Sequence, residues 1–308
     1  HRLMTPGPTR TIGPAWLDDR ITRGDIVIID GATGSELEAR GVPMVEKGWS
    51  VLAQLEYPDV LRTLHEDYLR VGASVIIANT FAAGRHLLEP GGLGDRVGDA
   101  HTKAVELAHQ ARENVGGEAA VAGSISPYMA DPTDQGWLAR LDDTYREQAE
   151  LLALAGVDLI ICEMMQDPGL SLPAIEAAHA TGLPVWVGLS AARAADGSLG
   201  TIDHPDLPFE QSADALLDDR VAVACVMHTE VRDVPPALDV VEKRWSGPLG
   251  VYPESGDFIE PHWQFVDIIE PAMLADAAHG WVERGVQIIG GCCGLGVEHI
   301  SALADRFA

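Results

Sequence analysis

Short apolar runs alternate along this chain with longer segments in which apolar residues recur every three or four positions. The short runs are rich in valine, isoleucine and alanine and have the length of buried strands, whereas the longer segments have the period of an amphipathic helix. The segment 58–72 is of the second kind, with Leu61, Leu64 and Tyr68 on one stripe, and the segment 144–155 repeats the pattern. This alternation is typical of repeated strand–helix units, which build a parallel sheet.

Eight of the short runs are predicted to be strands. They cover residues 26–30, 74–79, 119–124, 157–163, 184–189, 221–225, 248–252 and 286–290. Because eight strand–helix units close into a barrel, we predict an α/β fold made of a single (β/α)8 TIM barrel over residues 1–308. Residues 1–3 are interpreted as a tag remnant ahead of a natural start at Met4.

Polar side chains follow nearly every predicted strand, although the strands themselves are apolar. Barrel enzymes carry their chemistry at the carboxyl ends of the strands, so these residues are candidates for a functional site. The residues at these ends are Asp30, Asn79, Thr80, Ser124, Glu163, Ser190, Cys225, Tyr252, Cys292 and Cys293.

The composition excludes some classes of binding partner and indicates the cellular compartment. The formal net charge of -26 would repel nucleic acids and anionic membranes over much of the surface. Four cysteines in 308 residues do not resemble a disulfide framework, so we expect reduced thiols. No apolar stretch has the length of a membrane span and no signal-peptide pattern begins the chain, which together predict a cytoplasmic protein.

Two adjacent cysteines stand in a glycine-rich segment close to the end of the chain, Gly290-Gly291-Cys292-Cys293-Gly294. Glycines let the backbone turn sharply after a strand, so that two consecutive side chains can converge on one metal ion. Cys225 follows another predicted strand and is the candidate third ligand. Three thiolates with one open position form a catalytic type of zinc site. The alternative is that adjacent buried cysteines act only as small hydrophobic residues.

Several motifs together resemble the homocysteine S-methyltransferase family over essentially the whole chain. They are Asp30-Gly31-Ala32-Thr33-Gly34-Ser35-Glu36-Leu37 with Arg40-Gly41, Gly48-Trp49-Ser50, Ala78-Asn79-Thr80-Phe81, Cys162-Glu163, Tyr252-Pro253-Glu254-Ser255-Gly256, and Ile289-Gly290-Gly291-Cys292-Cys293-Gly294 with Glu298-His299-Ile300.

The resemblance implies a (β/α)8 barrel in which Cys225, Cys292 and Cys293 hold Zn²⁺ and the sulfur of homocysteine binds as the fourth ligand. It also implies that Asp30 and Glu163 hold the ammonium group of the amino acid. Family members usually carry glycine, a β-branched residue and asparagine before the first of these cysteines, whereas this chain has Ala222-Val223-Ala224.

The chemistry expected of such a site is methyl transfer to a thiolate. A free thiol is mostly protonated at neutral pH, and coordination to zinc removes the proton. The acceptor sulfur would then displace a methyl group from an onium donor, for which S-methylmethionine, S-adenosylmethionine, betaine and dimethylsulfoniopropionate are equal candidates. The expected partners are therefore homocysteine and a small methyl donor, with no nucleic acid and no membrane, and self-association into a homo-oligomer is left open.

Other residues are assigned to the two substrates. Thr80 and Ser190 are candidates to bind the acceptor carboxylate, although turn hydrogen bonds explain such residues equally well. Trp49 and Tyr252 are candidates for the donor, because an aromatic face attracts an onium group. His228 stands three residues after Cys225, a spacing seen in some zinc sites, and is a candidate to touch the metal or the donor.

Each of these residues has an ordinary alternative reading. Trp49 and Tyr252 could serve only in packing, and His228 could be an ordinary loop residue. Asp30 could cap the helix that follows it. Cys162 is expected to lie in the core, because strand alternation sends it to the face opposite Glu163.

Other functions remain as alternatives to methyl transfer onto homocysteine. The acceptor could be another small thiol or a selenol, or the paired cysteines could form a non-catalytic zinc or redox sensor. A zinc hydrolase of the barrel type requires histidine and aspartate ligands, and the chain has no His-x-His motif.

Overall fold

The structure is a computed structural model that describes residues 11–130, 133 and 135–308. The predicted tag remnant and the start at Met4 therefore lie outside the described residues. Within the described ranges, no helix is long and apolar enough to cross a bilayer.

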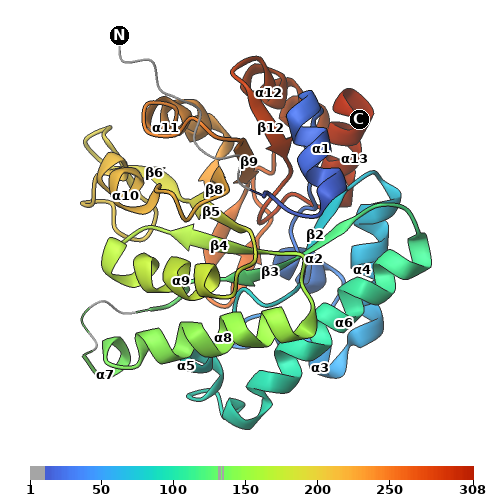
Figure 1. The fold of residues 1–308 in the computed structure, drawn as a ribbon, viewed down its shortest axis with the longest axis vertical. Coiled ribbons are helices and arrows are strands. Elements are labelled where there is room, and N and C mark those ends of the chain that lie inside the picture. The colour runs from blue at the N-terminus through green and yellow to red at the C-terminus, as the bar shows by residue number, and fades with distance from the viewer. Residues whose placement is uncertain (1–10, 131–132, 134) are drawn as a thin grey trace.

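Eight parallel strands form the central barrel, as predicted, and helices surround it (Figure 1). Their order in the sheet is β1-β12-β9-β8-β5-β4-β3-β2, and a parallel bridge between Ile29 and Val75 joins the two ends. The barrel strands are β1 (Val27–Ile28), β2 (Val75–Ile77), β3 (Ala120–Ile125), β4 (Leu159–Met165), β5 (Val185–Leu189), β8 (Val223–Glu230), β9 (Leu249–Glu254) and β12 (Val286–Ile289).

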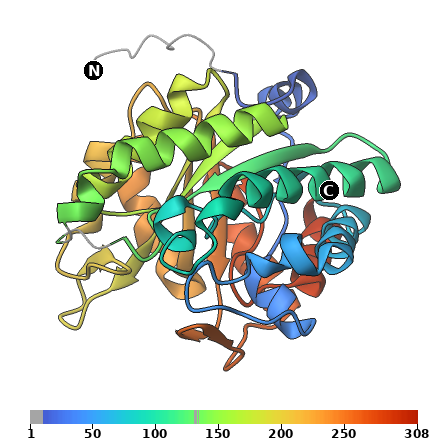
Figure 2. The same cartoon turned by 90° about the horizontal axis from the view of Figure 1, so that it is seen from below.

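The helices lie outside the barrel, and α6 and α8 run side by side on its outer face (Figure 2). The predicted helices 58–72 and 144–155 correspond to α4 and α8. The helices are α1 (Ala15–Arg23), α2 (Gly34–Ala39), α3 (Leu52–Glu56), α4 (Pro58–Arg70), α5 (Arg85–Leu88), η1 (Gly94–Arg96), α6 (Val97–Val115), α7 (Gln135–Leu138), α8 (Leu141–Ala155), α9 (Pro168–Ala180), α10 (Phe209–Leu216), η2 (Val231–Asp233), α11 (Val234–Val241), α12 (Pro271–Glu283) and α13 (Val297–Phe307).

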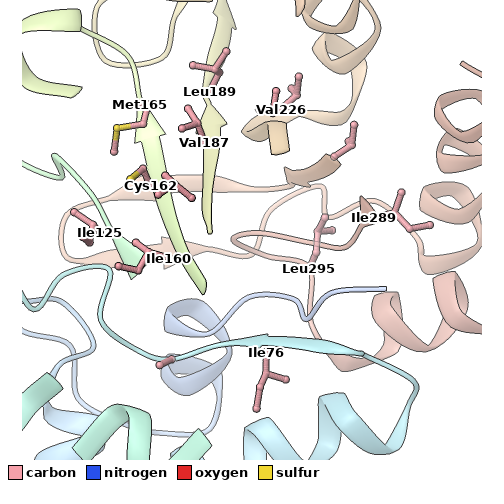
Figure 3. Close-up of a cluster of buried hydrophobic side chains, with 14 of the residues drawn as sticks. Ile76, Ile125, Ile160, Cys162, Met165, Val187, Leu189, Val226, Ile289 and Leu295 are labelled. Carbon is pink, nitrogen blue, oxygen red and sulfur yellow. The ribbon is translucent and has the colours of Figure 1, made fainter. Parts of the chain in front are cut away.

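Alternation along each strand divides the apolar residues into two cores. Outward-facing residues pack against the helices, and Figure 3 shows part of this layer with Ile160, Cys162 and Val226. Cys162 therefore belongs to the helix-facing core, which confirms the prediction made for it. The inward-facing residues fill the barrel and form the second core.

Helix α1 covers the amino-terminal end of the barrel. Leu17 and Ile21 of this helix belong to the inner core, and Nε1 of Trp186 donates a hydrogen bond of 2.8 Å to the carbonyl of Ile12. Gln287, at the start of β12, donates to the carbonyl of Ile21. This end of the barrel is filled with apolar side chains, so the polar chemistry collects at the opposite end.

The structure differs from the predicted elements in two places that matter for the site. Strand β8 continues to Glu230, five residues beyond its predicted end at Cys225. Two antiparallel hairpins, which were not predicted, follow barrel strands: β6 (Ala191–Arg193) with β7 (Leu199–Thr201), and β10 (Asp257–Ile259) with β11 (His262–Gln264). An apolar run marks which residues are buried, but backbone pairing can continue past the last apolar residue.

Candidate metal centre and substrate cavity

A cavity of about 520 Å³ opens at the carboxyl ends of the strands. Its wall is built by residues of β4, β8 and β9, by the segments that follow β1, β2, β3, β4, β7 and β12, and by the β10–β11 hairpin. Among the residues that line it are Trp49, Phe81, Tyr128, Glu163, His228, Tyr252, Phe258, Trp263, Cys292 and Cys293.

The two adjacent cysteines occupy a tight turn directly after β12. The backbone N–H of Cys292 donates to the carbonyl of Pro253 at 2.7 Å, and the carbonyl of Cys293 accepts from Ser255 at 3.0 Å. Gly294 adopts a φ of 78°, and a Cβ at this position would collide with the backbone of Ser255. The turn brings the two Sγ atoms to 3.9 Å from each other.

His228 completes a group of three residues whose ligand atoms all lie within 4.8 Å of one another, with Cys292 and Cys293. Its Nδ1 lies 3.6 Å from Sγ of Cys292 and 2.7 Å from Oε2 of Glu254. Burial opposes the charged imidazole, but Glu254 and Cys292 together raise the pKa of His228 well above its usual value. His228 lies in β8 and lines the cavity, so the alternative of a loop histidine does not describe it.

Both the pairing of the cysteines and their burial keep Cys292 protonated in the absence of a metal. The hydrogen bond between the Cys292 and Cys293 thiols and the loss of solvent raise the pKa of Cys292 well above its usual value, although His228 opposes the shift. A metal cation bound at this position would lower the pKa of Cys292, because a coordinated thiol loses its proton.

Cys225, the predicted third ligand, does not belong to this group. It faces the interior of the barrel, and its Sγ packs against the backbone of Gly250, where any Cβ would approach it to 2.6 Å. Burial, and then the charge of Glu163, raise the pKa of Cys225 far above its usual value. The structure therefore brings Cys292 and Cys293 together, adds His228 to them, and leaves Cys225 deeper in the barrel.

Asp30 and Glu163 form a pair of buried carboxyl groups beside the cavity. Asp30 accepts a hydrogen bond of 2.7 Å from the backbone of Ile77, so it caps a strand rather than the following helix, and its Oδ1 has no hydrogen-bond partner. Glu163 accepts a hydrogen bond from the hydroxyl of Ser124. Burial raises the pKa of both carboxyl groups, and Glu163 raises that of Asp30 further.

No described lysine, arginine or histidine forms an ion pair with either carboxyl group. His228 offsets only part of the effect of burial on Glu163, so the two buried acids are unfavourable in their charged forms. A ligand ammonium group placed between them would supply the missing charge.

Thr80 and Ser190 do not line the cavity. The hydroxyl of Thr80 donates to the carbonyl of Ser124 and accepts from its N–H, both at 2.9 Å. The hydroxyl of Ser190 lies 3.2 Å from Sδ of Met227. Both hydroxyl groups therefore contact other protein groups, which agrees with the alternative that they form structural hydrogen bonds rather than bind the substrate.

Aromatic rings surround the mouth of the cavity. Trp49 has ring-centroid distances of 6.4 Å to Phe81, 6.4 Å to Tyr128 and 6.1 Å to Phe258. Trp263 lies 6.2 Å from Phe258, on the same hairpin. Trp49 was predicted from the sequence, whereas the rings of Tyr128, Phe258 and Trp263 were missed.

Two of the missed rings had a signal in the sequence, because Phe258 and Trp263 flank the turn that follows Glu254 and Ser255. Glu254 was quoted only as part of a motif. Tyr252 lies deeper than the rim, and burial raises the pKa of its hydroxyl well above the usual value.

The fold and this cavity define the class of the protein as a TIM-barrel enzyme with a thiol-rich centre at the mouth of the barrel. The family model for homocysteine S-methyltransferase matches residues 27–307, and the chain belongs to that family.

Relatives and solved structures agree with this assignment. The chain is 30% identical to the homocysteine S-methyltransferase of Escherichia coli (strain K12), over 93% of this chain and 96% of the relative. It is 29% identical to betaine--homocysteine S-methyltransferase 1 of Danio rerio, over 94% of this chain and 75% of the relative. The metallated form of the homocysteine methyltransferase MmuM from E. coli superposes with a TM-score of 0.75 and 28% identity, over 95% of this chain and 99% of that chain.

Proposed function

We propose that this protein transfers a methyl group from a small onium donor to the thiol of homocysteine, giving methionine, and that it depends on zinc. Besides the family, one observation carries the proposal. A single cavity brings a group of thiols close to Glu163 and the neighbouring Asp30, two buried carboxyl groups that form no ion pair among the described residues. Homocysteine has the complementary groups, a thiol and an ammonium, on one small molecule.

The donor set of the centre fits a tetrahedral metal ion. With Zn–S bonds of about 2.3 Å and Zn–N bonds of about 2.0 Å, the edges of the tetrahedron are about 3.5 to 3.8 Å. The Sγ–Sγ distance of 3.9 Å and the Sγ–Nδ1 distance of 3.6 Å are close to these values. Zinc bound here would convert a coordinated substrate thiol to a thiolate at neutral pH.

Glu163 and Asp30 orient the acceptor in this proposal. An ammonium group between them would stabilise their charged forms and would hold the acceptor in one position relative to Cys292 and Cys293. Positioning of this kind accelerates a displacement, because the reacting sulfur and carbon must be collinear with the leaving atom.

The aromatic rim would receive the positively charged donor. A sulfonium or quaternary ammonium group is attracted to the faces of rings such as Trp49 and Phe258. The acceptor sulfur forms a bond to the methyl carbon while the bond from that carbon to the onium atom breaks, and the bonding electron pair leaves with the neutral product. The transfer itself needs no general base, since the thiol proton has already been lost.

A donor screen tests the proposal. Zinc-loaded, reduced protein is incubated with homocysteine and, separately, with S-methylmethionine, S-adenosylmethionine, betaine or dimethylsulfoniopropionate, and methionine is measured by mass spectrometry. We expect methionine with at least one donor. Product only with another thiol or a selenol would reassign the acceptor, and no methylated product with any acceptor would favour the sensor alternative.

A further inference from the structure

Strand β8 carries two residues that could complete the metal centre, Cys225 and His228, three positions apart. The register of β8 against β9 shows which of the two lies at the level of the double cysteine. Cys225 pairs with Gly250 of β9, and Met227 pairs with Tyr252. The turn that holds the double cysteine is bonded to Pro253 and Ser255, above the level of Tyr252.

The height of each candidate along the barrel follows from this register. Because a strand rises about 3.3 Å per residue, the level of Gly250 lies about 10 Å below that of Pro253. Cys225 is therefore too deep to share an ion with Cys292 and Cys293 unless the strand moves. His228, three residues further along β8, reaches the level of the double cysteine.

A local distortion turns His228 into the cavity. Val223, Cys225 and Met227 face the barrel interior, and Ala224 and Val226 face the helices, so regular alternation would send residue 228 outward. The register of β8 against β9 shifts between Met227 and Glu230, and His228 adopts a φ of 42°. A bulge with a left-handed residue redirects a side chain, and such strain in a non-glycine residue is typical of functional sites.

The surroundings of His228 also suit a metal ligand. Nδ1, the ring nitrogen that faces Sγ of Cys292, also lies 2.7 Å from Oε2 of Glu254, so a metal bound to this nitrogen would have the carboxylate beside it. Zinc with two thiolates and a neutral imidazole carries no net charge, and the adjacent Glu254 carboxylate adds one negative charge. A zinc ion with three thiolates would have the same net charge of minus one, so the Glu254 carboxylate supplies the charge that a third thiolate would otherwise supply.

We propose that Cys292, Cys293 and His228 are the protein ligands of the metal, that Cys225 is a packing residue, and that Glu254 supplies a negative charge beside the centre. The proposal rests on the proposed function only for the identity of the metal as zinc and of the substrate thiol as the fourth ligand.

Counting ligand atoms tests the assignment without any turnover. Reduced protein loaded with Zn²⁺ alone is measured by X-ray absorption at the zinc edge, before and after homocysteine is added. We expect two sulfur neighbours and nitrogen or oxygen neighbours before the addition, and three sulfurs after it. Three sulfurs before the addition would overturn the assignment in favour of Cys225.

Variants separate the two candidates on β8. Cys225→Ala should retain about one zinc per chain with the two-sulfur shell, whereas His228→Gln should lower zinc affinity by at least about 100-fold. His228→Cys should restore binding with a three-sulfur shell, which a loss of folding could not do. Zinc lost from Cys225→Ala but kept by His228→Gln would contradict the proposal.

Glu254→Gln should lower zinc affinity by about 10-fold and leave the sulfur count at two, because it removes a negative charge beside the metal and no sulfur ligand. A changed sulfur count would refute that role. The two proposals also fail separately. A two-sulfur centre in a protein that methylates no thiol would contradict the function alone, and a three-sulfur centre in an active methyltransferase would contradict the ligand set alone.

Discussion

The mouth of the barrel and the rest of the molecule contain the same residue types, but the surroundings of these residues differ. Cys162 lies among isoleucine and methionine side chains in the helix-facing core, whereas Cys292 and Cys293 meet each other and His228. Glu66 of α4 pairs with Arg70, whereas Glu163 forms no ion pair among the described residues and has only the charge of His228 nearby. Both regions contain buried groups, and what distinguishes the mouth is that thiols, carboxyl groups and the His228–Glu254 pair gather around one cavity.

This difference teaches that a buried reactive side chain is not by itself evidence of a site. Both ring nitrogens of His65 in α4 are buried without a hydrogen-bond partner, yet this residue does not line the cavity. Substitutions at the mouth are therefore compared with substitutions of the same residue type elsewhere in the molecule, and His65 is tested in its own right.

The largest effect is expected for the paired cysteines. Cys292→Ala and Cys293→Ala should each reduce bound zinc from about one per chain to nearly none, because a structural or catalytic zinc needs three protein ligands or more. The zinc content of reduced protein is measured by plasma mass spectrometry. Cys162→Ala is the control, and this variant should bind as much zinc as the unsubstituted protein. Equal loss of zinc in all three variants would contradict the assignment of Cys292 and Cys293 to the metal centre.

Glu163→Gln should weaken acceptor binding about 10- to 100-fold, because a charge-assisted contact with an ammonium group contributes roughly 1.5–3 kcal/mol. Zinc content should not change. Isothermal titration of the zinc-loaded protein with homocysteine measures the effect, and Glu66→Gln on α4 is the matched control. Unchanged affinity in Glu163→Gln would remove this carboxylate from the acceptor site.

His65 should make the fold sensitive to acid. Burial lowers the pKa of His65 to about 4, whereas in the unfolded chain the imidazole takes up a proton near its ordinary pKa of 6.5. Between these values the unfolded state binds more protons, so stability falls as the pH falls. The contribution is about 2 kcal/mol between roughly pH 7.5 and pH 5.

Urea unfolding of metal-free, reduced protein at the two pH values measures this effect. His65→Met should lose less free energy of unfolding on acidification than the unsubstituted protein does. Identical losses would show that His65 does not control the acid response, and that other buried groups do.

The smallest effect is expected at the aromatic rim. Trp49→Leu should raise the KM of the onium donor about 3- to 10-fold, because a cation–π contact contributes about 0.5 to 2 kcal/mol. Trp49→Phe should recover part of the loss. Trp16→Leu, at the opposite end of the barrel, is the control, and a similar rise in that variant would point to a general loss of stability instead.

Much of the fold was predictable because it depends on local periodicity. All eight barrel strands fall on the predicted runs, and α4 and α8 fall on the predicted helical segments. The side of the barrel that carries the chemistry also followed from the sequence, since polar residues stand after apolar strands. Asp30, Glu163, Trp49 and the double cysteine all lie at that end.

The sequence by itself determined the barrel, the helix-facing position of Cys162 and the tight turn at Cys292 and Cys293, because each follows from residue spacing or from glycine within a few positions. Only the tertiary structure decided which residue of β8 stands beside that turn. The bulge before Glu230 and the level of Cys225 against Gly250 depend on pairing between strands that are distant in sequence. A shift of a few residues along a strand moves a side chain by about 3.3 Å per residue, and no local pattern records that displacement.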